Sequence, residues 1–487
     1  MIIMSAHLLK QENILTNAAN ANNWLNEELS ECHFKDERLT KRFTKLLGQM
    51  WDGRGESIPF ACQDWSNTKA AYRFFSNDRI TEHEILSGHF YSTQKRVEKI
   101  TQPVLILHDT TEFSYQRKKP EQIGATRIVI NGRPAFRQVK HHTICGMLMH
   151  SSLVVTQEGK PLGLAAIKFW TRKKFKGCNA LRGHINPARI PIHEKESIRW
   201  LENMKQSTEL LNQPQQCVHI GDRESDIYEL FCAAQDLGTN FLVRTCVDRL
   251  AGDGKHTIIS EMNEVKVKGQ HRIEVRDKKG NLSTAVLEIK YRRIHVLPPL
   301  GKEKHYPPLQ LTVIHAIERK KPKNRNPIVW KLLTNLIVSS RRDAIEKLKW
   351  YALRWKIEVF HKILKSGCKA EESKLRTAKG LAKLISVFCI LSWRIFWMTM
   401  LNRIAHNVPA RLALTVFEIN LLDHLIRNKM RSRKKKLSDY LTKIARLGGY
   451  LARTSDAPPG NLVMWRRLSR LTDIALGFNM ALKIVGN

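Results

Sequence analysis

Strand-like apolar runs, separated by helical segments, mark the middle of the chain. Val104–Leu107 and Cys217–Ile220 are two such runs, residues 143–155 supply more, and Phe241–Arg244 follows later. Apolar strands that alternate with helical segments are typical of a mixed sheet covered by helices. The pattern therefore predicts an α/β fold for this part of the chain.

The pattern changes to a period of two between residues 248 and 326. Four segments of this stretch place apolar and polar residues in turn: Glu264–Gly269, Arg272–Arg276, Thr284–Tyr291 and Leu309–His315. Such alternation, with turns between the segments, is typical of antiparallel strands. We therefore expect an antiparallel β insertion here, followed by Trp330 and the strand-like Lys331–Thr334.

Both ends of the chain have helical patterns. Within residues 1–80, spacings of three and four residues form one basic stripe from Arg38, Lys41, Arg42 and Lys45. This stripe is either a DNA contact or a solvated helix face. Leu381–Leu401 is the most apolar later stretch, but it contains Lys383 and Arg394. We therefore expect a packed helix near the core rather than a membrane span.

The charge of the chain indicates its partner. There are 82 basic and 45 acidic residues, which give a formal charge of +37. Self-repulsion on this scale destabilises a compact protein, so an enzyme of small metabolites is disfavoured. Nucleic acid is the favoured partner, because each neutralised phosphate releases counterions. A membrane surface and a generally basic proteome are the alternatives.

The cysteines and the first residues indicate the compartment. Nine cysteines are scattered without a CxxC spacing, which disfavours a zinc site or a disulfide framework and predicts a reducing environment. The first residues have no secretory pattern. We therefore expect a cytoplasmic protein without membrane association.

Three acidic residues carry the candidate chemistry. Asp109 and Asp222 each follow a strand-like run, and side chains at the carboxyl ends of strands converge outside the edge of a sheet. A third acid, Glu358, lies on a helical stretch. At about 100° per residue, three polar side chains share its face within roughly 60°: Tyr351, Arg354 and Lys365.

Clustered carboxylates predict a metal site. They raise one another's pKa and become tolerable when a divalent metal ion neutralises them. Oxygen ligands suit Mg²⁺ or Mn²⁺, and two such ions can support an in-line phosphoryl transfer. The sequence therefore predicts a two-metal site for phosphoryl transfer.

Each signal also has a plainer interpretation. An aspartate after a strand is often a cap, and Asp222 could cap the helix that follows it. Glu224 and Asp226 would then be first-turn charges favoured by the helix dipole. The polar face around Glu358 could be a surface salt-bridge ladder. Beside that face, one apolar arc is expected to pack against the protein: Ile345, Leu348, Ala352, Trp355 and Val359.

Several segments together resemble the DDE transposases of bacterial insertion sequences, in particular the cut-and-paste enzymes of the Tn-five type. Around the acids the matching segments are His108–Thr111, Gly221–Ile227 and the family's Y-R-E-K signature, here Tyr351, Arg354, Glu358 and Lys365. Further matches are Ala71–Phe74, Trp330 with Leu332–Thr334, and Ala445–Gly449. The resemblance extends over almost the whole chain.

The resemblance implies an RNase H-like catalytic core interrupted by the antiparallel β insertion and flanked by helical domains. An N-terminal DNA-end-recognition domain would occupy residues 1–80. The catalytic domain would occupy residues 81–405, with its insertion at about 248–326, and a C-terminal dimerisation domain residues 406–487. The last segment keeps only Trp465 where the family has a Trp-rich helix.

The resemblance also implies the catalytic roles. Asp109, Asp222 and Glu358 would be the catalytic and metal-binding triad, with Mg²⁺, or Mn²⁺, in a two-metal site. The element end beside the cleaved phosphate would be contacted by Tyr351, Arg354 and Lys365.

Further DNA contacts are implied outside that helix. Trp330 would stack on a base flipped out of the duplex, the alternative being a buried strand tryptophan. Arg244 would contact the DNA from its strand. Arg42 would contact it from the N-terminal domain, a role that Lys41 or Arg38 could also fill.

The expected function is cut-and-paste transposition. Water attacks the element end, the released 3′-hydroxyl forms a hairpin, a second water opens it, and the 3′-hydroxyl joins target DNA. Each step is an in-line phosphoryl transfer, so one site serves all four. The expected partners are double-stranded DNA and a second copy of the chain in a nucleoid-associated homodimer. The alternatives are a non-catalytic DNA-binding relative that acts as an inhibitor and an RNase H-like nuclease without strand transfer.

Overall fold

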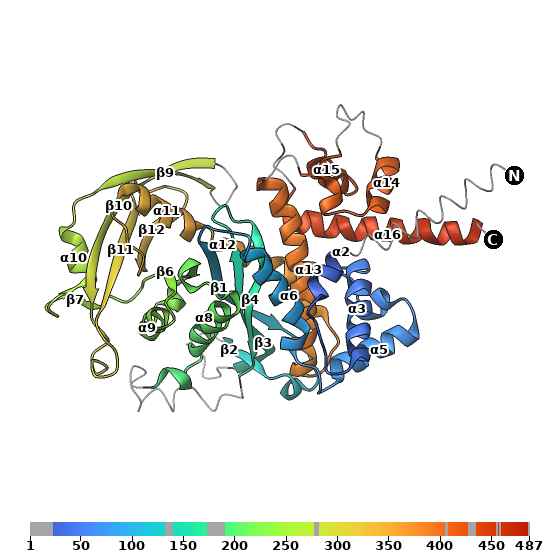
Figure 1. The fold of residues 1–487 in the computed structure, drawn as a ribbon, viewed down its shortest axis with the longest axis horizontal. Helices are drawn as coiled ribbons and strands as arrows, with labels where there is room; N and C mark the ends of the chain where they lie inside the picture. Colours follow the sequence, from blue (N-terminus) through green and yellow to red (C-terminus); the bar gives the residue numbers. More distant parts are fainter. Residues whose placement is uncertain are drawn as a thin grey trace.

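Helices and one large sheet make up most of the computed structural model (Figure 1). The structure describes residues 23–131, 140–172, 190–276, 282–404, 408–426, 435–453, 456 and 459–485. The first 22 residues of the expected 1–80 domain thus lie outside the described part. Before the first strand come α2 (Asn23–Leu29), α3 (Glu37–Asp52), α4 (Ile58–Cys62), α5 (Trp65–Ser76) and α6 (Glu82–Val97).

The described residues form a sheet of twelve strands. They are β1 (Val104–Ser114), β2 (Ala125–Asn131), β3 (Lys140–Val155), β4 (Pro161–Trp170), β5 (Cys217–Gly221), β6 (Asn240–Arg244), β7 (Leu250–Ala251), β8 (His256–Thr257), β9 (Gly269–Arg276), β10 (Leu282–Val296), β11 (Leu309–Glu318) and β12 (Val329–Thr334). The order is β2-β3-β1-β5-β6-β12-β11-β10-β7-β8, with β4 on β3 and β9 on β10. β1, β5 and β6 are parallel, whereas β3 is antiparallel to β1. The predicted α/β class is confirmed.

Strands β7 to β12 extend this sheet beyond β6 by antiparallel pairing. One predicted strand in this region, Glu264–Gly269, is wrong. Instead, Ile258–Glu264 forms helix α10, and β9 begins only at Gly269. Thr257 caps the start of α10, and Ile258 and Met262 bury one face of it. The cap and this i, i+4 burial account for the helical state of Glu264, whereas residues 265–268 form neither helix nor strand.

Helices cover both faces of the sheet (Figure 1). Adjacent residues of β12 show the division, because successive side chains of a strand point to opposite faces. Leu333 packs with Phe231 and Met262 of α9 and α10, whereas Leu332 belongs to the larger core that includes Leu348. The helices concerned are α8 (Ile198–Leu211), α9 (Tyr228–Asp236), α11 (Arg341–Ala352), α12 (Trp355–Lys362) and α13 (Ala378–Ile404).

The most apolar helix, α13, is buried inside the protein. By length and composition Ala378–Leu401 could cross a membrane, but 94% of that apolar stretch is buried. Its Lys383 donates to the carbonyl oxygens of Phe75 at 3.3 Å and Asn77 at 2.6 Å, where α5 ends. Arg394 lies over a tryptophan ring, 4.5 Å from its centroid. The predicted packed core helix is confirmed.

The buried side chain of Trp465 contacts residues from the N-terminal and central parts of the chain. The C-terminal helices are α14 (Val416–Leu425), α15 (Leu437–Arg446) and α16 (Asn461–Val485). Trp465 of α16 is buried against Gly55 and Gly367, and a Cβ built on either glycine would lie 2.7 Å from an atom of the indole. Ser469 of the same helix donates to the Arg54 carbonyl at 2.6 Å. The N-terminal helices, the centre and α16 therefore meet at this side chain.

Substitution of Gly367 by alanine tests this contact. Gly367→Ala is expected to lower the free energy of unfolding by about 1–3 kcal/mol, because the new methyl group overlaps the Trp465 ring. Gly477→Ala is the matched control. It lies on exposed α16 with nothing within 4 Å of an added Cβ, and should stabilise by about 0.5–1 kcal/mol. Urea unfolding followed by tryptophan fluorescence measures both, and equal stabilities would contradict the packing described.

Candidate active site

Asp109 lies inside β1 rather than at its end. The parallel pairing of β1 with β5 stops at Leu107, opposite Ile220. The antiparallel pairing with β3 continues and sets Asp109 opposite Ser151. The Asp109 Oδ1 accepts a hydrogen bond from the Thr110 N–H at 2.9 Å. The carboxyl group therefore lies just beyond the point where β1 leaves its parallel neighbour.

Two acids from distant parts of the sequence act on Asp109. The pKa of Asp109 is raised to about 7, first by burial and then by the charges of Asp222 and Glu358. The Thr110 N–H and the Arg354 guanidinium act in the opposite direction. Because the acids come from β1, the end of β5 and α12, the fold places three separate carboxylates in one electrostatic field.

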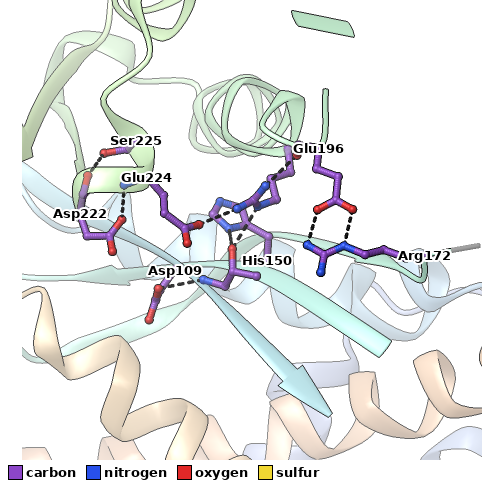
Figure 2. Close-up of polar contacts among 9 residues, drawn as sticks. Asp109, His150, Arg172, Glu196, Asp222, Glu224 and Ser225 are labelled. Carbon is purple, nitrogen blue, oxygen red and sulfur yellow. Dashed lines mark hydrogen bonds and ion pairs between the residues drawn. The ribbon is translucent and has the colours of Figure 1, made fainter. Parts of the chain in front are cut away.

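Asp222 directly follows β5 and caps the short turn Arg223–Ser225. Its Oδ1 accepts a hydrogen bond from the Glu224 N–H at 2.9 Å, and its carbonyl oxygen accepts one from the Ser225 hydroxyl at 2.6 Å (Figure 2). The capping interpretation of Asp222 is therefore observed, although the turn is 3₁₀ and the helix proper begins later. The cap involves one of the two carboxylate oxygens.

Asp226 is an anchor for a loop and not a first-turn charge. Helix α9 begins at Tyr228, and the Asp226 carboxylate is buried. It accepts hydrogen bonds at 2.5–2.8 Å from groups of the segment after β6, namely Thr245, Cys246, Val247 and Arg249. The helix-dipole interpretation of Asp226 is therefore wrong, because its partners lie about twenty residues away in the sequence.

The stretch that carries Glu358 consists of two helices rather than one. α11 ends at Ala352, α12 begins at Trp355, and a π-helical turn at Ile363–Gly367 follows. The N–H groups of the two intervening residues bond three residues back, which tightens the chain between the helices. Trp355, expected in the packed arc, is 47% exposed. The prediction of one continuous helical face is therefore wrong.

Arg354, the residue just before α12, forms an i, i+4 ion pair with Glu358 within that helix. The Arg354 side chain is mostly buried, whereas that of Glu358 is about half exposed. The Arg354 charge also lowers the pKa of Asp109 and of the Tyr351 phenol. In this structure Arg354 therefore offsets the negative charge of the acids.

Trp330 and Arg244 lie beside Tyr351, and the Asp222 charge acts on the Tyr351 phenol. The buried Tyr351 ring meets the half-buried Trp330 ring edge-on, with centroids 5.5 Å apart and planes at 72°. Burial raises the pKa of Tyr351, the Asp222 charge adds to this, and the Arg244 charge and its hydrogen bond to the phenol act against it. Arg244 Nη2 also donates to the Val329 carbonyl at 2.9 Å. Four of the predicted site residues are thus brought together here.

Lys365 has partners near the end of β1. Its Nζ lies 3.8 Å from Glu371 Oε1 and 5.8 Å from the centroid of the Phe113 ring. The same Glu371 oxygen accepts a hydrogen bond from the Ser114 N–H at 2.7 Å. A π-helical turn adds a residue per turn, so the angle expected between Glu358 and Lys365 on a regular α-helix does not apply.

Arg42 connects two helices of the N-terminal part. Its Nη1 and Nη2 donate to the side-chain and main-chain oxygens of Asn67 on α5, at 2.9 and 2.6 Å. The guanidinium is therefore engaged within the chain. The other members of the basic stripe on α3 are exposed: Arg38, Lys41 and Lys45.

His361 is a residue of the site that the sequence interpretation missed. It is buried on α12, with Nδ1 3.8 Å from Asp109 Oδ2 and Nε2 2.8 Å from the Ser151 hydroxyl oxygen. Burial lowers the pKa of His361 to about 3, so a neutral imidazole faces Asp109 at neutral pH. Its spacing of three residues from Glu358 was the available signal, because such residues are neighbours on a helix.

The three carboxylates suit a divalent metal ion in chemical type. Oxygen donors match Mg²⁺ or Mn²⁺, and added positive charge would favour the ionised form of Asp109, which burial and, to a smaller extent, the neighbouring acids disfavour. Among the residues that the structure describes, however, no three His, Cys, Asp or Glu side chains are grouped closely enough to hold a metal ion. The donor set therefore fits the metal in kind and in charge, while its oxygens do not share a coordination shell here.

A family comparison identifies the N-terminal segment. Residues 21–80 match the family model described as transposase DNA-binding. The matched segment includes helices α2 to α5 and the basic stripe on α3. This match supports a DNA-binding transposase and DNA as the partner of the chain.

Replacement of Asp109 by asparagine should stabilise the metal-free protein. The pKa of the carboxyl is about 7 in the folded protein and 3.8 ordinarily, so its ionisation costs folding free energy as the pH rises from 4 to 7. Asp109→Asn removes this cost and keeps the acceptor for the Thr110 N–H. At pH 8 without divalent ions it should be more stable by roughly 2–4 kcal/mol. Urea unfolding at pH 8 and pH 4 measures this, and a less stable variant at pH 8 would contradict it.

Proposed function

We propose that the protein is a DDE transposase that binds element ends, cleaves them and joins the freed 3′-hydroxyl groups to target DNA. The observation that carries the proposal is the placement of Asp222 and Glu358 near enough to the buried Asp109 for their charges to act on it, in a chain with a transposase DNA-binding segment. An RNase H-like core is supported by parallel β1, β5 and β6 with antiparallel β3 and β4 at one edge. Strands β7 to β12, placed before Glu358, support the β insertion.

Asp109, Asp222 and Glu358 are assigned as the ligands of two Mg²⁺ or Mn²⁺ ions. Such ions, when bound, stabilise charge on the attacking and leaving oxygens of an in-line displacement. The remaining residues orient the substrate. Arg354 would exchange the Glu358 carboxylate for a DNA phosphate, since each can accept two parallel hydrogen bonds from a guanidinium. Glu358 would thereby become free to act as a ligand.

The proposed reaction has four in-line transfers. Water attacks the phosphodiester at the element end, and the 3′-hydroxyl leaves. That hydroxyl attacks the opposite strand and closes a hairpin, a second water opens the hairpin, and the same hydroxyl attacks target DNA. Each step breaks one phosphorus–oxygen bond as it forms another. The end of the DNA strand must therefore keep the same position relative to the acids through all four steps.

Trp330, Tyr351 and Arg244 are proposed to hold the end of the strand. The Trp330 ring is half-buried and meets Tyr351 edge-on, so one part of it is available to a base. Stacking on an aromatic ring contributes about 1–3 kcal/mol per base, which offsets the cost of unstacking a flipped nucleotide. Lys365 would contact the phosphate further along the strand.

A homodimer that bridges two element ends belongs to the proposal. Trp465 is occupied inside the chain, so a contact between copies would use the far half of α16. Phe478 and Met480 in that half are 45% and 64% exposed. Exposed apolar side chains on a projecting helix favour such an interaction surface.

A non-catalytic relative that acts as an inhibitor is the second candidate. It is favoured by the Arg354–Glu358 ion pair and by the lack of a three-ligand group among the described residues. It predicts DNA binding without cleavage under any metal condition. Cleavage of DNA therefore separates the two functions.

Glu358→Gln tests the catalytic assignment. With end-containing duplex and Mg²⁺, the variant is expected to cleave at least about 100-fold more slowly, a loss of about 2.7 kcal/mol or more of transition-state stabilisation. DNA binding should be retained, because the amide keeps the shape of the side chain. Glu372→Gln, on the exposed surface nearby, is the matched control and should cleave normally.

The outcomes of this experiment separate the candidates. Equal cleavage by wild type and Glu358→Gln would refute the assignment of the acids. DNA binding without cleavage by the wild type, in Mg²⁺ and in Mn²⁺, would favour the inhibitor. Cleavage without joining of a pre-cut end to a plasmid would favour a nuclease without strand transfer.

The basic stripe of α3 gives a separate prediction for DNA binding. Lys45→Gln should weaken binding to duplex DNA and reduce the slope of log affinity against log salt by about 1, because one phosphate contact is lost. The control is Lys255→Gln on the exposed turn between β7 and β8, which should leave both quantities unchanged. Affinity measured by fluorescence anisotropy at several salt concentrations tests this. An unchanged slope for Lys45→Gln would contradict a contact at α3.

A further inference from the structure

Arg199, on α8, bonds to both chain segments that carry the aspartates. Its Nε donates to the Thr110 hydroxyl oxygen at 3.1 Å, and its Nη2 donates to Glu224 Oε2 at 2.6 Å. Its Nη1 donates to the Glu196 carbonyl at 2.9 Å, just before α8 begins. One guanidinium thus connects β1, the turn after β5 and the start of α8.

The two residues that Arg199 contacts are also those that hold the carboxylates. The Thr110 N–H donates to Asp109 Oδ1, and the Glu224 N–H donates to Asp222 Oδ1, each at 2.9 Å. A single residue therefore connects Arg199 to each aspartate: Thr110 to Asp109, and Glu224 to Asp222. Figure 2 shows Asp109 and the Asp222–Glu224 turn on neighbouring segments.

The backbone ladder does not fix these two aspartates relative to each other. The described pairing of β1 with β5 ends at Leu107 and Ile220, two residues before each aspartate. Beyond that point the strands are free to diverge as the sheet twists. Arg199 supplies a cross-connection between the two segments where the ladder has ended.

The Arg199 side chain is itself held firmly. It is 11% exposed, and its guanidinium carbon lies 5.3 Å from the Trp170 ring centroid and 6.0 Å from that of Trp200. The Thr110 hydroxyl has a second partner, Nδ1 of buried His150, at 2.9 Å. A planar fork fixed between aromatic rings keeps its donors at set separations, which a lysine could not do.

We infer that Arg199 is a positioning residue that sets the separation of the Asp109 and Asp222 carboxylates through Thr110 and Glu224. This inference rests on the proposed function, because the separation of the two carboxylates matters only if both of them bind the divalent metal ions. Arg199 touches neither carboxylate. Its removal is expected to weaken metal binding and leave the chemical groups of the site intact.

Arg199→Met tests the inference, with Mn²⁺ as the probe. The variant should need roughly 10-fold more Mn²⁺ for half-saturation, both in electron paramagnetic resonance titration and in cleavage, as is usual for loss of a group that orients metal ligands. Arg199→Lys can reach only one of its two partners and should recover part of the loss. Cleavage at saturating Mn²⁺ and DNA binding should stay close to those of the wild type.

Arg172→Met is the matched control. Arg172 pairs with Glu196 next to α8, with Nε 2.6 Å from Oε1, and its side-chain hydrogen bonds go to Glu196 and Thr126 rather than to Thr110 or Glu224 (Figure 2). The Arg172→Met variant removes a comparable ion pair between an arginine and a glutamate, and it should leave the Mn²⁺ requirement unchanged. If both variants lose thermal stability alike and neither changes the Mn²⁺ requirement, Arg199 is only a structural residue and the inference is refuted.

Two further variants keep the test decisive. If Arg199→Met does not fold, Thr110→Val, which lacks the hydroxyl, should raise the Mn²⁺ requirement, and Thr110→Ser should restore it. Equal requirements for the two Thr110 variants would refute the inference. A wild type that neither binds Mn²⁺ nor cleaves DNA would refute the proposed function and the inference with it, whereas an active wild type with an unaffected Arg199→Met refutes the inference alone.

Discussion

The burial of the Asp109 carboxyl group beside two other acids is the constraint on which this site depends. Burial is the main cause of the raised pKa of Asp109, and the charges of Asp222 and Glu358 add to it. Without a bound metal ion, this arrangement lowers the stability of the folded protein. Rigid elements must therefore keep the three carboxylates in place. The parallel ladder joins β1 to β5 as far as Leu107 and Ile220, just before the two aspartates, and α12 packs on β1. Loss of stability at the site in return for function is common in enzymes.

The DNA-binding helices share their core with the rest of the protein. One continuous hydrophobic cluster includes Phe74 of α5, Leu332 of β12 and Leu471 of α16. The buried Arg54 also reaches across this boundary, with Nη2 3.4 Å from an Oε1 of Glu418 on α14. Because close-packed interiors resist deformation, the recognition helices and the candidate site are held in a fixed relation. DNA bound at α3 would therefore be presented to the acids in a defined register.

Apolar runs located the strands well, because strands buried on both faces need continuous apolar side chains. They placed β5, β6 and the first half of β1, and the ends of two runs pointed to Asp109 and Asp222. The break between α11 and α12 could not be predicted, because no proline or glycine marks it. The partners of Asp226 and Arg42 were equally hidden, since each is more than fifteen residues away. Residue type and spacing reveal a charge, but only the fold reveals what it meets.

The shared core also limits which shortened products of the gene could fold. A chain translated from Met50 would lack α2 and most of α3, including Phe43, whose ring is stacked on Phe74 at a centroid distance of 5.7 Å. The rings left on α5 would then face water, at a cost of roughly 1.5–3 kcal/mol for each large side chain. Such a polypeptide would need a chaperone, or an intact copy to cover those rings, before it could compete with the full-length protein.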